Sequence, residues 1–147
     1  MFKHILIATD GSPLANKAAK AGIALASALG VKVTAYCALE MLQSIYYADG
    51  YAFDQATIDG FEEGARKAGQ KHVDAIGKMA KAAGVPCASL VTNVVSAYEG
   101  IIDAAKKRKC DVIFMASHGR RGLSKLMMGS VTQKVLTHSR IPVVVYR

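Results

Sequence analysis

Short apolar runs alternate with helix-like stretches along this chain, and this alternation is the strongest constraint on its fold. Five runs have the composition of strands and cover residues 2–9, 31–39, 85–95, 111–116 and 141–146. Four helices are expected between them, over residues 14–29, 59–83, 96–109 and 130–138. Nearly continuous apolar runs are typical of strands that are covered on both faces. Because strands joined through helices form right-handed crossovers, we predict an α/β fold, a single-domain three-layer sandwich over residues 1–147 with a mostly parallel five-stranded sheet.

Local signals mark the ends of the expected helices. Ser12 is placed to cap the first helix, and Gly30 to end it. The Ser-x-x-Glu pattern at Ser96 and the Ser-x-x-Gln pattern at Ser130 predict capping boxes at the starts of the last two helices. Residues 40–60 are the least regular part, and they fit a functional loop and a hydrophobic lid equally well.

The charge pattern narrows the class of partner. The formal net charge is +8, yet the basic residues are scattered apart from one run at residues 106–109, at an expected helix end. Cations there complement the helix dipole, and no aromatic residues interleave with them, so nucleic-acid binding is disfavoured. No apolar run approaches the roughly 18 residues of a membrane span, and no signal peptide is recognisable. We therefore expect a cytoplasmic protein whose three cysteines are reduced thiols.

A glycine-bearing loop follows the fourth apolar run. It contains Gly119 and ends at Gly129 and Ser130, where a helix is expected to begin. A helix N-terminus leaves main-chain N–H groups unpaired and carries partial positive charge, and glycines let a phosphate approach it. The loop has no Walker lysine, and Asp10-Gly-Ser-Pro follows the first run where a dinucleotide fingerprint would lie. We expect a phosphate-bearing ligand, most simply a nucleotide.

The predicted topology offers a way to join two distant segments. Ligands of open α/β sheets bind beyond the carboxyl ends of the strands, where the strand order reverses. A reversal between the first and fourth strands would place Asp10 beside the glycine loop. Asp10 fits equally well as an acidic residue at a helix start. Arg120 and Arg121 are either phosphate ligands or solvated, and His118 has no Ser or Cys partner at triad spacing.

Two sequence blocks resemble the universal stress protein family. Lys3-His-Ile-Leu-Ile-Ala-Thr-Asp-Gly-Ser12 is similar to that family's opening, and residues 115–145 are similar to its closing block. The nucleotide-binding branch carries Gly-x2-Gly-x9-Gly followed by Ser or Thr. The spacing is kept here by Gly119, Gly129 and Ser130, but Ala116 stands in place of the first glycine. Its methyl group is harmful only if that position needs a positive φ or if the ribose abuts the Cα.

The resemblance implies an adenine nucleotide α hydrolase-like, Rossmann-like fold and ATP as the ligand, with Mg or Mn as an optional companion. By position it implies that Asp10 contacts the ribose or a metal ion and that the main chain of Ala38 reads the adenine edge. Met115 and Ala116 would line the base and ribose. The phosphates would be bound by Gly119, Gly129, Ser130, Val131 and Thr132.

The preferred function is therefore an ATP-binding protein of stress response or signalling that acts through a nucleotide-dependent homodimer. The resemblance places the dimer contact at residues 141–146, whose edge would be exposed in a monomer. One alternative is a nucleotide-independent dimeric interaction module of the same fold. Another is an adenine-nucleotide hydrolase, which would be slow because no general base is evident. Whether the chain is an enzyme stays open, and its protein partner is unknown.

Overall fold

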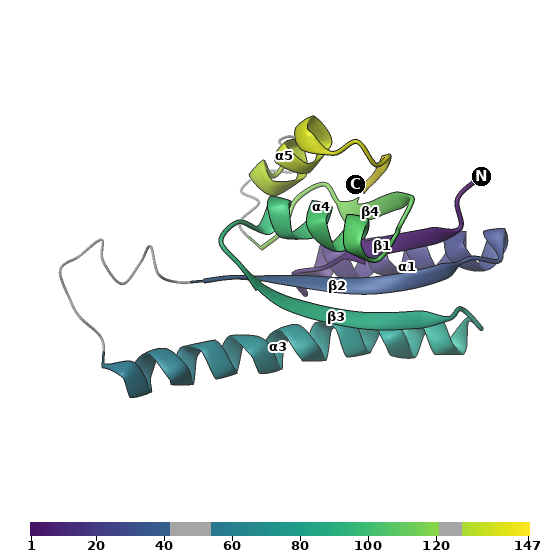
Figure 1. Ribbon diagram of the computed structural model, residues 1–147. Coiled ribbons are helices and arrows are strands. Elements are labelled where there is room, and N and C mark those ends of the chain that lie inside the picture. Colours follow the sequence, from purple (N-terminus) through teal and green to yellow (C-terminus); the bar gives the residue numbers. More distant parts are fainter. Residues whose placement is uncertain (42–53, 121–127) are drawn as a thin grey trace.

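The computed structural model describes residues 1–41, 54–120 and 128–147, and these residues form one five-stranded sheet with helices on both faces (Figure 1). The elements, in chain order, are β1 His4–Ala8, α1 Pro13–Leu29, β2 Lys32–Glu40, α3 Gln55–Ala82, β3 Cys87–Val94, α4 Ala97–Lys107, β4 Val112–Ala116, α5 Ser130–His138 and β5 Val143–Tyr146. The strand order is β3-β2-β1-β4-β5, and every neighbouring pair is parallel. The predicted fold class is confirmed.

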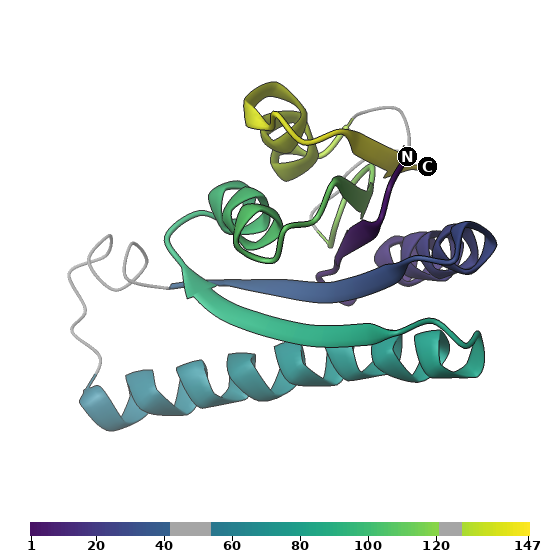
Figure 2. The ribbon, with the colours of Figure 1, turned by 45° about the vertical axis from the view of Figure 1, so that its right-hand side comes forward.

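The helices divide the core into two parts (Figure 2). Ile5 and Ile7 of β1 pack on the face covered by α1 and α3, whereas Leu6 and Ala8 pack on the face covered by α4 and α5. Every residue of β1 and of β4 is buried. This explains why both strands read as continuous apolar runs, since alternate residues enter different cores.

The order of the strands reverses beside β1. The chain runs outward from β1 to β2 and β3, and then returns to the other side of β1 with β4 and β5. The reversal considered in the sequence analysis is thus present, and the residues that follow β1 and β4 lie at neighbouring carboxyl ends. No helix within the described ranges is long and apolar enough to cross a membrane.

The helix starts differ from the expected ones in three places. Helix α3 begins at Gln55, four positions before the expected start at Asp59, because Asp54 caps it and accepts the Thr57 N–H at 2.7 Å. Most of the irregular segment that precedes it lies outside the described residues. The N-cap of α5 is Gly129, so the capping box predicted at Ser130 is wrong, because Ser130 is already the first helical residue.

The cap of α4 is also supplied differently. Ser96 occupies the N-cap position, but its side chain makes no cap hydrogen bond. Instead, Glu40 at the end of β2 accepts the Ala97 N–H at 2.9 Å. The start of α4 is thus tied to the carboxyl end of β2 by a contact that local sequence spacing does not reveal. The three cysteines, Cys37, Cys87 and Cys110, are free thiols.

Candidate functional site

Asp10 lies directly beyond the carboxyl end of β1, and its carboxylate joins two loops. Oδ1 accepts the Ser12 N–H at 3.0 Å, and Oδ2 accepts the Arg120 N–H at 2.9 Å. The second bond links the end of β1 to the loop after β4, across the reversal in strand order. Burial alone would raise the pKa of Asp10, but the hydrogen bonds from Ser12 and Arg120 outweigh it and the pKa lies below its ordinary value.

Both glycines of the loop motif permit close approaches within the protein itself. A Cβ at Gly119 would lie 2.3 Å from Asp10 Oδ2, so the loop could not close on the carboxylate with any other residue. A Cβ at Gly129 would lie 3.1 Å from the Cα of His118, and the Gly129 N–H donates to the Ser117 carbonyl at 2.8 Å. Each of the two glycines therefore has a structural reason that does not depend on a ligand.

The N-terminus of α5 is the best anion site among the described residues. Gly129 offers no side chain to cap it, and the first-turn N–H groups of Ser130, Val131 and Thr132 have no partner within an α-helix. Ser130 is exposed, so its hydroxyl and its N–H are both accessible. Thr132 is buried, and its hydroxyl donates to the Ala116 carbonyl at 2.9 Å, which leaves only its main-chain N–H for a ligand.

Ala116 is the last residue of β4 and pairs with Tyr146 of β5. Lys109, with φ 56°, is the only residue other than glycine with a positive φ in the described part of the chain. The backbone at Ala116 therefore accepts a methyl group without strain, and that methyl packs in the core beneath α1 and α3. Met115 points into the opposite core, and Ala38 of β2 pairs with Thr92 of β3.

The sequence analysis considered Arg120 and Arg121 as phosphate ligands or solvated residues and did not consider His72. Arg121 lies outside the described residues, whereas the side chain of Arg120 bonds within the protein. The Nε of Arg120 donates to the Asp10 carbonyl at 2.8 Å, and its Nη2 contacts the same oxygen. Nη2 also lies 3.2 Å from Nε2 of His72 on α3. The His72 ring packs against Gly11, where a Cβ would lie 2.1 Å from the ring. No motif connects His72 to the loop, because only the packing of α3 brings them together.

The comparisons with known proteins agree over the whole chain. The family model described as Universal stress protein family matches residues 1–147. The chain belongs to this family. The universal stress protein MJ0531 of Methanocaldococcus jannaschii is 31% identical over 100% of this chain and 83% of its own length. The universal stress protein YxiE of Bacillus subtilis is 30% identical over the full length of both chains.

Solved structures show the same fold. The protein MJ0577 of M. jannaschii superposes with a TM-score of 0.82 at 24% identity, over 99% of this chain and 95% of that one. An Arabidopsis thaliana family member with AMP bound has a TM-score of 0.68 at 14% identity, over 97% and 90% of the two chains. A universal stress protein in complex with cAMP has a TM-score of 0.72 at 17% identity, over 99% and 97%.

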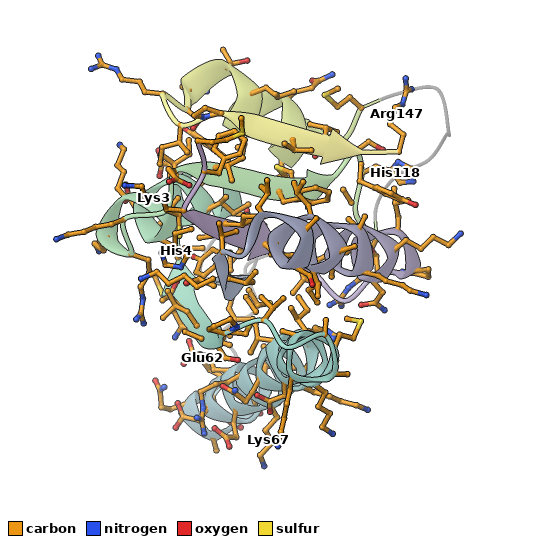
Figure 3. The ribbon with its side chains drawn as sticks, turned by 90° about the vertical axis from the view of Figure 1, so that its right-hand side faces the viewer. Lys3, His4, Glu62, Lys67, His118 and Arg147 are labelled. Atoms are coloured by element: carbon orange, nitrogen blue, oxygen red, sulfur yellow. The ribbon has the colours of Figure 1, made fainter. Side chains whose placement is uncertain are left out.

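In this universal stress protein, a shallow depression of about 310 Å³ lies between the start of α1 and the glycine loop, lined by Ser12, Pro13, Leu14, Lys17, His118, Gly119 and Arg120. Nδ1 of His118 is 3.2 Å from the hydroxyl of its neighbour Ser117. Within the described residues no carboxylate hydrogen-bonds His118, so the pair lacks the third group of a catalytic triad. His118 and Arg147 lie at the opposite edge of the molecule from His4 (Figure 3).

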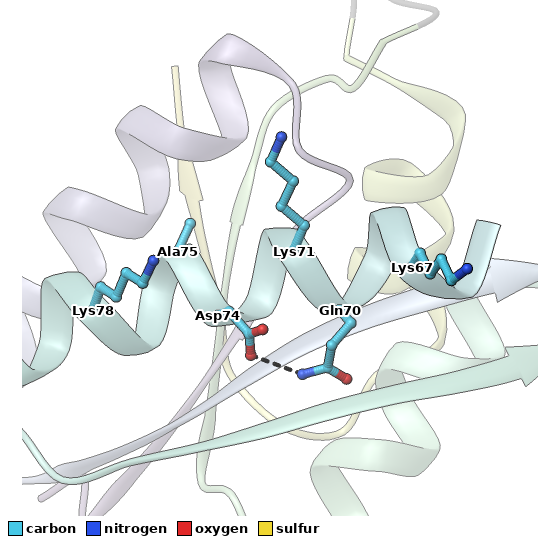
Figure 4. A pocket seen from close by; sticks show the side chains of 6 residues that line it. All are labelled: Lys67, Gln70, Lys71, Asp74, Ala75 and Lys78. Carbon is cyan, nitrogen blue, oxygen red and sulfur yellow. Dashed lines mark hydrogen bonds between the residues drawn. The ribbon is translucent and has the colours of Figure 1, made fainter. Parts of the chain in front are cut away.

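A second depression, of about 400 Å³, runs along the outer surface of α3 (Figure 4). Its lining residues all come from that helix: Lys67, Gln70, Lys71, Asp74, Ala75 and Lys78. The Gln70 amide donates to Asp74 at 2.8 Å, one helical turn away. A groove built by one helix encloses little of a ligand, so the carboxyl ends of β1 and β4 remain the better candidate site.

Proposed function

We propose that this universal stress protein binds an adenine nucleotide, in the first place ATP, beyond the carboxyl ends of β1 and β4. The observation that carries the proposal is the bond from the Arg120 N–H to Asp10, which joins the two motif segments at the reversal in strand order. The uncapped start of α5 lies at the other end of the same loop. Relatives of the same fold whose structures contain AMP or cAMP support adenine as the base.

Each part of the nucleotide has a candidate partner. The phosphates are expected at the first turn of α5, where main-chain N–H groups and the Ser130 hydroxyl are donors. The adenine edge is expected at the main chain of Ala38, and the ribose at Asp10. Each carboxylate oxygen of Asp10 accepts one N–H and keeps a further lone pair for a ribose hydroxyl.

The described residues offer too few ligands to hold a metal ion by themselves, so a metal ion would bind only together with the phosphates of the nucleotide. No cluster of three or more His, Cys, Asp or Glu side chains exists in the described ranges. Mg or Mn would therefore be held mainly by phosphate oxygens, with Asp10 as one protein ligand. The metal would neutralise phosphate charge there, while the protein binds and orients the nucleotide.

The output of binding is expected to be a change in association rather than rapid chemistry. A nucleotide bound beyond the carboxyl end of β4 would also act on β5, because the Ser117 N–H, directly after β4, donates to the Tyr146 carbonyl at 2.7 Å. The proposed homodimer contact lies on β5, so the nucleotide and the dimer would share a strand. We propose stress response or signalling as the setting, with slow ATP hydrolysis at most.

One observation favours the alternative, a dimeric module that works without nucleotide. The Arg120 side chain bonds the Asp10 carbonyl, so contacts within the chain itself can account for the position of Arg120 beside β1. In that case the glycine motif would serve only the fold.

The first test is whether the purified protein carries or binds a nucleotide. Protein prepared without added nucleotide is denatured, and the released ligand is identified by mass spectrometry. ATP is then added to the emptied protein, and the melting temperature is followed. A ligand at a hundredfold over its Kd stabilises the native state by about 2.7 kcal/mol. Recovery of no nucleotide, together with no ATP-induced shift, would refute the proposal in favour of the nucleotide-independent module.

The matched variants for this test are Ser130→Asp and Ser130→Asn. A carboxylate at the first position of α5 is favourable for the helix dipole but repels phosphate. Ser130→Asp should therefore keep or raise the ligand-free melting temperature and abolish the ATP-induced shift. Ser130→Asn, which is neutral and similar in size, should keep most of the shift. An equal shift in both variants would place the phosphates elsewhere.

A further inference from the structure

The side chain of Arg120 occupies the position just beyond β1 where a ligand is expected. Its Nε and Nη2 both bond the carbonyl of Asp10, which lies two residues beyond Ala8, the last residue of β1. Its Nη2 then reaches His72 on α3, at 3.2 Å. A single side chain thus connects the loop after β4, the end of β1 and a helix of the neighbouring layer.

We propose that Arg120 is an intramolecular competitor of the nucleotide, and that the base and ribose bind only after its guanidinium has left Asp10 and His72. The inference rests on the proposed function, since it concerns the regulation of that same site. It assigns to His72 a role as the residue that holds the competitor in place. Neither residue then contributes to affinity for a nucleoside; both reduce it.

The geometry of Asp10 supports this competition. The main-chain N–H of Arg120 bonds the carboxylate, and the Arg120 side chain bonds the carbonyl of the same residue. Because a Cβ at Gly119 would lie 2.3 Å from Asp10 Oδ2, the loop is already pressed against this residue. The guanidinium bonds the carbonyl of the residue whose carboxylate is the proposed ribose partner, so we infer that ligand and side chain compete for the space around Asp10.

The position of His72 is equally well fixed. The ring packs over Gly11, whose φ of +77° and missing Cβ leave room for it. Nε2 can accept from Arg120 only when the ring is neutral with its proton on Nδ1. Burial lowers the pKa of His72, and the positive charges of Arg120 and Lys71 lower it further. The negative charge of Asp10 raises the pKa but does not outweigh them. The ring is therefore neutral near pH 7, in the state that accepts.

The magnitude follows from the equilibrium between the closed and open side chain. The apparent Kd of a ligand rises by the inverse of the fraction of protein that is competent to bind. The contacts of Arg120 are exposed, so the closed state is favoured only modestly. We expect the competition to weaken nucleoside binding by about 3- to 10-fold, as a few solvent-exposed hydrogen bonds would.

The test uses adenosine, which has no phosphate to attract or repel an arginine. Adenosine and ATP are titrated into the emptied full-length protein by calorimetry. Arg120→Gln should tighten adenosine binding by about 3- to 10-fold. His72→Phe keeps the ring volume but removes the acceptor, so it should tighten binding to a smaller extent. Arg140→Gln is the control, because Arg140 is exposed and precedes β5 at the opposite end of the strands; it removes the same charge and should change nothing.

The outcomes separate the two levels of the proposal. If adenosine binds the wild type, and Arg120→Gln leaves its Kd unchanged or weakens it, Arg120 is not a competitor. If neither adenosine nor ATP binds the wild type or any variant, the proposed function itself is refuted. Circular dichroism and melting curves of each variant show whether it is folded. Arg120 is exposed, so its variant is expected to fold even if His72→Phe does not.

Discussion

At the scale of single residues, the contacts that would receive a ligand are the same ones that hold the ends of the strands together. Gly119 lets the residues after β4 approach Asp10, and the hydroxyl of Thr132 donates a hydrogen bond to the Ala116 carbonyl. A substitution at either position therefore changes folding as well as binding. Ser130 is the sharper probe because it is exposed and caps nothing.

His4 shows a different constraint, the cost of placing a titratable ring in a core. Its Nε2 is 2.8 Å from the Thr34 hydroxyl, and its buried Nδ1 makes no well-formed hydrogen bond within the described ranges. Burial lowers the pKa of His4 and Lys32 lowers it further, against the opposing effects of Asp111 and of the Arg108 carbonyl. The unfolded chain therefore binds a proton more readily than the folded one.

We predict that the free energy of unfolding falls as the pH drops from about 6.5 through the lowered pKa of His4. Above pH 6.5 the ring is neutral in both the folded and the unfolded state, so protonation of the unfolded chain does not lower the free energy of unfolding there. His4→Gln should make the pH profile shallower in this range, measured by urea denaturation between pH 7.5 and 5. His138→Gln, at an exposed ring, is the control. Identical profiles for the wild type and His4→Gln would contradict the prediction.

At the scale of elements, the sequence predicts the strands better than the helix starts. The apolar runs of β1 and β4 are visible because both faces are buried, so every residue carries the signal. The cap of α4 comes from Glu40, which is distant in the chain, and no local pattern could reveal it. The pairing of Asp10 with the glycine loop was predictable from topology, whereas His72 was not, because it depends on how α3 packs.

Helix α3 forms despite several glycines, and these differ in purpose. A Cβ at Gly64 would meet nothing within 4 Å, but a Cβ at Gly69 would lie 3.0 Å from Leu39 and 3.2 Å from Val91. Gly69 therefore sets the distance between α3 and the sheet. We predict that Gly64→Ala raises the free energy of unfolding by about 0.5–1 kcal/mol, through helix propensity alone.

The matched variant is Gly69→Ala, which has the same propensity gain but must displace Leu39 and Val91. It should be neutral or destabilising, by up to about 2 kcal/mol. Urea denaturation of both variants provides the comparison. Equal stabilisation by the two substitutions would show that α3 does not need its close approach to the sheet at Gly69.

At the scale of the whole molecule, the sheet ends in two edge strands, β3 and β5. An unpaired edge offers main-chain donors and acceptors to another chain. The Ile113 N–H donates to the Pro142 carbonyl at 2.9 Å, and the Ser117 N–H to the Tyr146 carbonyl at 2.7 Å. Since main-chain groups alternate in direction along a strand, those of Val143 and Val145 point to the open edge. These are the groups that an antiparallel partner would use.

We therefore predict that Val145→Pro converts the proposed homodimer to monomer without unfolding it. Proline removes one outward N–H and leaves the ladder to β4 intact, which is tolerated only on an edge. Sedimentation should show the wild type at twice the 15.6 kDa of one chain and the variant at that mass. Val145→Ala keeps the N–H and should stay dimeric. A folded Val145→Pro variant that remains dimeric would exclude pairing through β5. The edge of β3 would then be the surface to test. The proposed route from the nucleotide to the dimer through Ser117 and Tyr146 would be excluded as well.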